Sequence, residues 1–400
     1  MEIDLMLGGQ GGSAYDAAIE RARRSAKTYE RKRRREKARV EEIAASLPSD
    51  SSAVPRTLPR RGKAEVEKIE ALLAKSWSLR YQNPSDMLGY ATMAVMCAKK
   101  LDTRIHGRQR VLDLLGRALA EQGNAYRVLD QLDLAEKTLE EAGHVLGLGS
   151  RDESLRIRLL ELDAALAAAR RQFRTAAAYL VVVFEYGEAR GDRHLAGRAM
   201  IQRGLYVGYD GDPEQALRLL DEGLSRVDEA QEPELVQTAI HNQLLFIAEC
   251  GRFDEARRFW FRNLKILNRD NGLVNRYRLN WINGRIEAGL GRPDRAEAIF
   301  REVKQDFERL ERPYAAAIVG LDLAAALLAQ NRPDEAAEVV LKAHRVFQAL
   351  RIKREAVAAV LVLFHAIKRG EATVKMVEKV AAYLRLLERD PNARFDPQPF

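Results

Sequence analysis

The sequence predicts an all-α protein, built as a solenoid in which pairs of helices repeat along the chain. An alanine recurs with spacings of 41, 40, 40, 40 and 40 residues, at Ala135, Ala176, Ala216, Ala256, Ala296 and Ala336. A fixed period of this length is the sequence signature of a repeat architecture. Composition agrees, because 46% of the residues are hydrophobic and only 12 Pro and 26 Gly interrupt the 400-residue chain.

Each of these alanines closes a short turn motif. The motif Gly-Arg-Phe-Asp-Glu-Ala at residues 251–256 returns in related form at residues 291–296 and 331–336. Prolines stand where a helix is expected to begin, at Pro213, Pro293 and Pro333. Their missing N–H costs nothing in the first turn of a helix. The motif therefore predicts a tight turn between two antiparallel helices, A and B.

The positions around the turn predict close packing of the two helices. Twelve residues before each alanine, five of six positions are small: Gly123, Ala164, Gly204, Leu244, Gly284 and Ala324. Four residues after each alanine, the side chain is large and apolar: Leu139, Leu180, Leu220, Trp260, Phe300 and Val340. The small pair lets the helices approach, and the large residue fills the space beside them.

This pattern resembles the tetratricopeptide repeat (TPR), in a long form of about 40 residues rather than 34. The resemblance covers residues 105–351, which hold six units. Leu244 replaces the small residue in the fourth unit, and the aromatic marks of the standard repeat are mostly absent, so other helical-pair solenoids stay open. The resemblance implies a right-handed superhelix whose concave groove binds protein or peptide ligands.

Composition divides the chain into seven parts. They are a flexible lead (1–13), a basic helical arm (14–47), a linker (48–62), N-terminal capping helices (63–104), six TPR-like repeats (105–351), C-terminal capping helices (352–389) and a tail (390–400). The linker contains Pro and Ser clusters, which favour irregular structure. Terminal units of a solenoid are expected to be atypical because they cap it.

Several features predict a cytoplasmic protein without a membrane anchor. The two cysteines, Cys97 and Cys250, lie far apart in the sequence and indicate no disulfide framework. The first twenty residues carry no Lys or Arg, unlike a secretory signal. The longest apolar runs, residues 176–184 and 314–329, are too short to span a bilayer, and Asp322 interrupts the second.

The sequence predicts no catalytic residue, no metal ligand and no cofactor. The six histidines have no metal-ligand spacing with one another or with the cysteines. No nucleophile-elbow or dinucleotide-binding motif is present, and the glycines at 8, 9, 11 and 12 are not followed by Gly-Lys-Ser/Thr. We therefore expect a non-catalytic protein.

One face of the predicted A helices carries a recurring arginine. Eighteen residues before the alanine, arginine occupies four of six units, and nearby positions on the same face carry Gln, Asn and Arg. The predicted partner-binding groove consists of Arg117, Arg158, Arg198, Gln202, Asn242, Arg278 and Arg285. Guanidinium groups bind carboxylates or phosphates, and amides hold an extended peptide backbone. The alternative is that these arginines pair with neighbouring carboxylates, such as Arg117 with Glu121, on a solvated or unit-bridging surface.

The positive charge is concentrated in the arm. The net charge is +8, and residues 21–63 alone hold 15 Lys or Arg against 5 Asp or Glu. The densest part consists of Arg31, Lys32, Arg33, Arg34, Arg35 and Lys37. Such a cluster suits phosphate contact without sequence readout, or an acidic protein.

We predict a protein-interaction scaffold or regulatory adaptor that binds a partner segment in its groove. The alternative is a nucleic-acid-associated or transcription-regulating factor that uses the arm.

Overall fold

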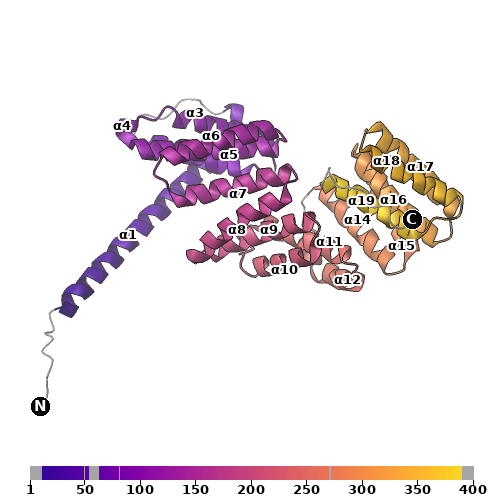
Figure 1. Ribbon diagram of the computed structural model, residues 1–400. Coiled ribbons are helices and arrows are strands. Elements are labelled where there is room, and N and C mark those ends of the chain that lie inside the picture. Colours follow the sequence, from indigo (N-terminus) through magenta and orange to yellow (C-terminus); the bar gives the residue numbers. More distant parts are fainter. Residues whose placement is uncertain (1–10, 49, 54–62, 81, 270–271, 390–400) are drawn as a thin grey trace, which may run out of the picture. The chain divides into compact units, whose positions relative to one another are not determined.

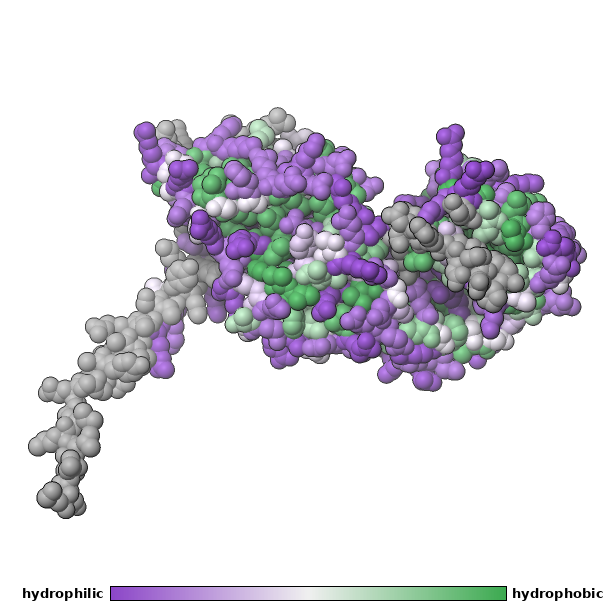
Figure 2. Space-filling view, in the orientation of Figure 1, coloured by the Kyte–Doolittle hydropathy of each residue, from purple (hydrophilic) through white to green (hydrophobic). Residues whose placement is uncertain are grey.

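The computed structural model describes residues 11–48, 50–53, 63–80, 82–269 and 272–389, and these residues form helices and no strand. The chain is therefore an all-α solenoid, as predicted. It forms two compact units, Met1–Ala169 (unit 1) and Arg170–Phe400 (unit 2). Figure 1 labels the helices, and Figure 2 shows hydrophilic residues over much of the visible surface. No described helix is long and apolar enough to cross a membrane. The cytoplasmic location and the seven sequence ranges stay predictions.

Unit 1 contains a long first helix and a bundle of shorter ones. Its helices are α1 (Gly11–Ser46), the 3-10 turn η1 (Ser51–Ala53), α2 (Lys63–Ser78), α3 (Pro84–Ala98), α4 (Thr103–His106), α5 (Arg108–Val128), α6 (Leu132–Leu148) and α7 (Glu153–Ala169). Helix α1 extends away from the bundle (Figure 1). It contacts α2, and Ala44 near the end of α1 is buried. Residues 1–10 of the predicted lead and residues 49 and 54–62 of the predicted linker lie outside the described residues.

Unit 2 continues the alternation of helices. Its helices are α8 (Phe173–Ala189), α9 (Arg193–Tyr209), α10 (Pro213–Leu224), α11 (Pro233–Glu249), α12 (Phe253–Arg262), α13 (Leu264–Leu267), α14 (Leu273–Gly289), α15 (Pro293–Arg309), α16 (Pro313–Ala329), α17 (Pro333–Ala349), α18 (Arg354–Lys368) and α19 (Val374–Arg389). Helices α9, α11, α14 and α16 are A helices of the repeat. The predicted tail, residues 390–400, lies outside the described residues.

The packing predicted around the turn is confirmed. All six recurring alanines have no exposed surface. A Cβ built on Gly123 would lie 2.8 Å from Cγ of Leu139, and one on Gly284 would lie 2.5 Å from Cε1 of Phe300. The small residue of helix A therefore touches the large residue of helix B, which fixes how closely the two helices approach.

The last helix pair departs from this pattern. The positions equivalent to the small residue and the alanine hold Phe364 and Met376, which prevent the usual close approach. The connection is also longer: α12 begins two residues after Gly251 (φ 73°), whereas α19 begins four residues after Gly370 (φ 73°).

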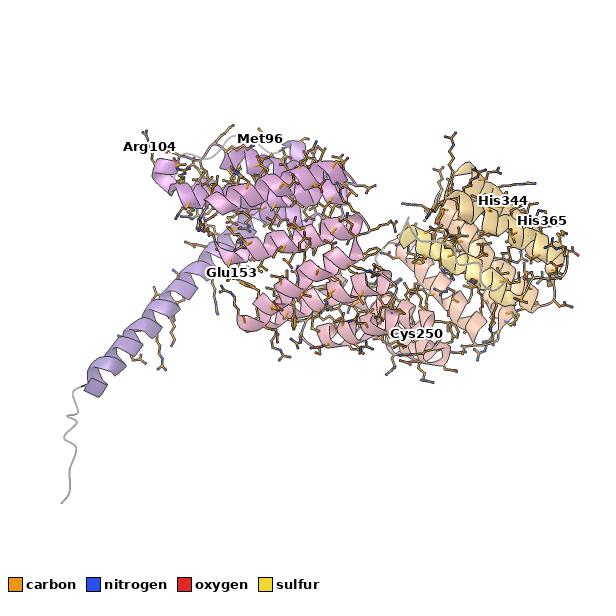
Figure 3. All side chains as sticks on the ribbon, viewed as in Figure 1. Met96, Arg104, Glu153, Cys250, His344 and His365 are labelled. Atoms are coloured by element: carbon orange, nitrogen blue, oxygen red, sulfur yellow. The ribbon has the colours of Figure 1, made fainter. Side chains whose placement is uncertain are left out.

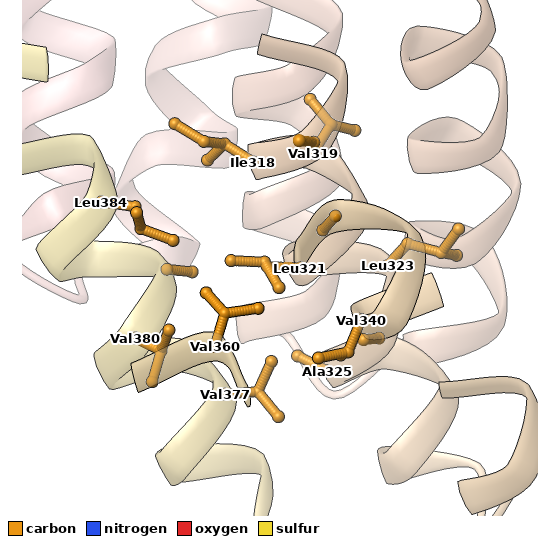
Figure 4. Close-up of a cluster of buried hydrophobic side chains, with 14 of the residues drawn as sticks. Ile318, Val319, Leu321, Leu323, Ala325, Val340, Val360, Val377, Val380 and Leu384 are labelled. Atoms are coloured by element: carbon orange, nitrogen blue, oxygen red, sulfur yellow. The ribbon is translucent and has the colours of Figure 1, made fainter. Parts of the chain in front are cut away.

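As a result, α19 contacts α16 more extensively than α18. Its side chains Val377, Val380 and Leu384 are fully buried in one cluster with Ile318 and Leu321 of α16 (Figure 4). The last helix therefore covers an A helix, a contact that the repeat pattern does not predict.

Candidate functional site

The predicted arginine row is divided between the two units, and its unit 1 members are engaged in ion pairs. Arg117 Nη1 lies 2.6 Å from Oε2 of Glu70, so it pairs with α2 and not with Glu121. Arg158 Nε donates to Oε1 of Glu121 at 3.0 Å, and its Nη1 donates to Oε2 of Glu161 at 3.3 Å. Arg117 therefore links α5 to α2, and Arg158 links α7 to α5. Pairing with carboxylates of other helices is the alternative that the sequence left open for the whole row.

In unit 2, the helix-A face is defined here by Arg198, Gln202, His241, Asn242, Arg278, Arg285 and Asp322. Arg198 on α9 donates to Oε1 of Glu232 at 2.7 Å, just before α11 begins, and only 17% of its side chain is exposed. Arg198 therefore also links successive A helices.

Asn242 is buried and hydrogen-bonded within the chain. Its Oδ1 accepts from the Tyr209 hydroxyl at 2.8 Å, and its Nδ2 donates to the Thr238 carbonyl at 2.8 Å. The residue is 5% exposed. Because both ends of the amide have partners, Asn242 stabilises the contact between α9 and α11 in this conformation.

Arg278 differs from the other arginines of the row. It is exposed on α14, and within the described residues no ion pair or side-chain hydrogen bond involves it. Its charge acts instead on the half-buried His241 of α11: burial, and secondly the charge of Arg278, lower the pKa of His241 to about 4. At neutral pH the exposed guanidinium of Arg278 thus acts on a neutral imidazole. Gln202 and Arg285 are half-buried on α9 and α14.

At the other end of the helix-A face, the chain itself occupies the surface. The buried carboxylate of Asp322 accepts from Trp281 Nε1 at 2.7 Å and from Arg385 Nη1 of α19 at 2.8 Å. The Tyr314 hydroxyl donates to the Leu384 carbonyl at 2.9 Å. Sequence reasoning missed this site, although an aspartate within the apolar run 314–329 was a signal that a buried polar partner was needed.

The arm presents exposed bases. Arg31, Arg34, Arg35 and Lys37 are exposed, while the side chains of Lys32 and Arg33 lie outside the described part of the structure. Lys37 lies 3.8 Å from Glu41, and nearer the bundle Arg39 lies 3.2 Å from Glu67 of α2. The arm's contact with nucleic acid stays a prediction.

Within the described residues, no group of His, Cys, Asp and Glu has a geometry that could hold a metal ion. His344 and His365 lie on α17 and α18, and Cys250 follows the last residue of α11 (Figure 3). Burial raises the pKa of Cys250 to about 11, with a further contribution from Glu214, so its thiol is protonated at neutral pH.

Two solved structures share the fold at low sequence identity. The first is aspartyl phosphate phosphatase F from Bacillus subtilis, with 12% identity, 71% of each chain covered and a TM-score of 0.51. The second is a Rap protein complexed with competence and sporulation factor, with 11% identity, 80% of this chain and 88% of the other covered, and a TM-score of 0.57.

No known family profile matches the sequence, and no curated protein matches it. The two solved structures are TPR-like helical-repeat proteins. With the repeat geometry described above, they establish that this chain is an all-α solenoid of TPR-like repeats.

Proposed function

We propose that this protein is a non-catalytic scaffold or regulatory adaptor, which binds a segment of a partner protein on the helix-A face of unit 2. The observation that carries the proposal is the open guanidinium of Arg278, since Arg117, Arg158 and Arg198 are already paired with carboxylates. The complex of the similar Rap protein with competence and sporulation factor supports ligand binding by this fold.

The chemistry of the site favours a ligand carboxylate. Arg278 offers two parallel N–H donors to such a group. His241, whose pKa the charge of Arg278 lowers, is neutral and adds no second positive charge. Gln202 adds an amide on α9, which packs against α11. The ligand segment is bounded on one side, because α19 covers α16.

Photo-crosslinking from the helix-A face tests the proposal. Thr238, exposed on α11 one turn before Asn242, is replaced by a photoreactive residue, and the products are identified by mass spectrometry after nuclease treatment. We expect one protein to be crosslinked in the wild-type background and lost with Arg278→Glu. Arg218→Glu is the matched control, because Arg218 is exposed on the B helix α10 and forms no described ion pair.

Two outcomes contradict the proposal. A partner that crosslinks equally to the Arg278→Glu variant does not use the open guanidinium. Capture that depends on the arm bases Arg34 and Arg35 and disappears with nuclease indicates nucleic acid instead.

A further inference from the structure

A second surface of unit 2 has an unusual combination of side chains. Phe261 is 63% exposed near the end of α12. Arg258, Arg262 and Lys265 are exposed at neighbouring helical positions, and only Asn263 separates α12 from α13. Residues three and four apart are neighbours on a helix surface, so Arg258 lies beside Phe261 on α12. Arg262 follows Phe261 directly, and Lys265 lies on α13, just after the end of α12. We call Arg258, Phe261, Arg262 and Lys265 the basic stripe.

The repeat itself shows that the basic stripe is not part of the shared architecture. The residue five after the alanine is Glu140, Val181, Asp221, Phe261, Arg301 or Leu341, and the residue six after it is Glu141, Val182, Glu222, Arg262, Glu302 or Lys342. The third and fifth repeats thus have the carboxylates Glu222 and Glu302 where the fourth repeat has Arg262. Packing of the helix pair does not require Phe261, because Asp221 and Arg301 occupy its position and are exposed.

The charges of the basic stripe are not neutralised within the described residues. No ion pair or side-chain hydrogen bond there involves Arg258, Arg262 or Lys265. The adjacent Arg257 is 3.6 Å from Glu287, and its guanidinium carbon is 6.0 Å from the Phe261 ring centroid. One exposed acid, Asp254, lies a turn before Arg258. Cations near a helix C-terminus stabilise it, but that effect does not explain an exposed phenylalanine beside them.

We propose that the basic stripe binds an acidic protein segment in which an apolar side chain lies between carboxylates. The apolar side chain covers the Phe261 ring, and the flanking carboxylates pair with the three cations, so that neither charge nor apolar surface stays uncompensated. This surface lies on a B helix and is independent of the helix-A face. It gives the protein a second contact for a partner or a site for a second partner.

Fluorescence anisotropy with three labelled synthetic peptides tests the proposal on the full chain. The first peptide has Glu residues around a central pair of Leu, the second replaces Leu by Ser, and the third replaces Glu by Gln. We expect the first to bind about tenfold more tightly than the other two. Phe261→Ser should reduce its affinity to that of the second peptide, and Arg262→Glu should abolish binding.

Three controls separate the basic stripe from other surfaces. Arg218→Glu, at the position equivalent to Arg258, and Val182→Ser, at the position equivalent to Arg262, should leave binding unchanged. Arg278→Glu should also leave it unchanged, which distinguishes this proposal from that for the helix-A face.

The proposal is overturned if the first peptide does not bind, or if Phe261→Ser binds it as tightly as the wild type does. It is equally overturned if only vesicles containing phosphatidylserine, or only a single-stranded oligonucleotide, bind in a Phe261-dependent manner. Circular dichroism of each variant checks that the exposed substitutions leave the helices intact.

Discussion

Arg385 in the last helix donates a 2.8 Å hydrogen bond to the carboxylate of Asp322, 63 residues earlier in α16. The same carboxylate accepts from Trp281 of α14, so one aspartate joins three helices. Asp322 is 8% exposed, and a buried carboxylate is tolerated when its charge and lone pairs have partners. Helix α19 is thus held on the helix-A face by a polar contact as well as by its apolar side chains.

Replacing Arg385 should destabilise unit 2. Arg385→Ala leaves Asp322 without its opposite charge, and breaking a buried pair in this way costs about 3 kcal/mol. Urea denaturation measures the change in the free energy of unfolding. Lys375→Ala, an exposed substitution on the same helix, should change it by less than about 0.5 kcal/mol. Equal losses for the two variants would show that the Arg385–Asp322 pair adds no net stability.

The pKa of His241 predicts a pH dependence of stability. Its pKa is about 4 in the folded protein against 6.5 for the unperturbed group, so below pH 6.5 the unfolded state binds the proton more readily. Stability should therefore fall as the pH falls from 6.5 to 4, by up to about 3 kcal/mol. Urea denaturation between pH 7 and pH 4 checks this, with His241→Gln expected to lose less stability than the wild type.

A second variant tests the electrostatic contribution to that shift. Arg278→Ala removes the neighbouring positive charge, so the pKa of His241 should rise, while burial keeps it below the ordinary value. An NMR titration of the imidazole protons measures the change directly. An unchanged pKa would place Arg278 too far from His241 to form the site proposed on the helix-A face.

Arg117 and Arg158, the two arginines of the predicted row that lie in unit 1, should differ in their contribution to stability. Arg158 is 23% exposed and serves the buried carboxylates of Glu121 and Glu161, whereas Arg117 and Glu70 are 39% and 27% exposed. Arg158→Ala should cost about 3 kcal/mol and Arg117→Ala at most about 1 kcal/mol.

The fluorescence of Trp77 measures the unfolding of unit 1 in these two variants, because Trp77 is the one tryptophan in residues 1–169. Replacing Trp260 and Trp281 by Phe isolates its signal. The guanidinium carbon of Arg158 lies 4.6 Å from the centroid of the Trp77 ring, so Arg158→Ala should also change the emission of the folded state. Equal losses of unfolding free energy in Arg158→Ala and Arg117→Ala would show that burial of the ion pair does not determine its contribution to stability.

The repeat was predictable from sequence because it depends on side-chain volume at fixed spacing. The arginine partners were not, since helical spacing places Glu121 beside Arg117, while in the fold Glu121 pairs with Arg158 and Arg117 pairs with Glu70, 47 residues away. Similarly, Asn242 was predicted to face a ligand, but its side-chain oxygen on α11 accepts a hydrogen bond from the Tyr209 hydroxyl on α9. Several carboxylates and hydroxyls could pair with each of these side chains, and only the packing of the helices determines which of them becomes the partner.

The last prediction concerns the sizes of the two residues that meet between helices A and B. Gly284 faces Phe300, whereas the same positions of the next repeat hold Ala324 and the smaller Val340, so in these two repeats a larger residue on helix A goes with a smaller one on helix B. Gly284→Ala puts a Cβ 2.5 Å from the Phe300 ring and should destabilise unit 2 by about 1–3 kcal/mol, despite the better helix propensity of alanine. Gly320→Ala is the control: its nearest neighbour is 3.5 Å away, so it should be neutral or stabilising by up to about 1 kcal/mol.

The double variant Gly284→Ala with Phe300→Val reproduces the pair of the next unit. Its free energy of unfolding should exceed the value expected from adding the two single losses, because the smaller valine relieves the clash that alanine creates. Chemical denaturation of the four proteins measures this coupling. Purely additive losses would mean that the helices separate to accommodate alanine, and the small residue would then not set the distance between helices A and B.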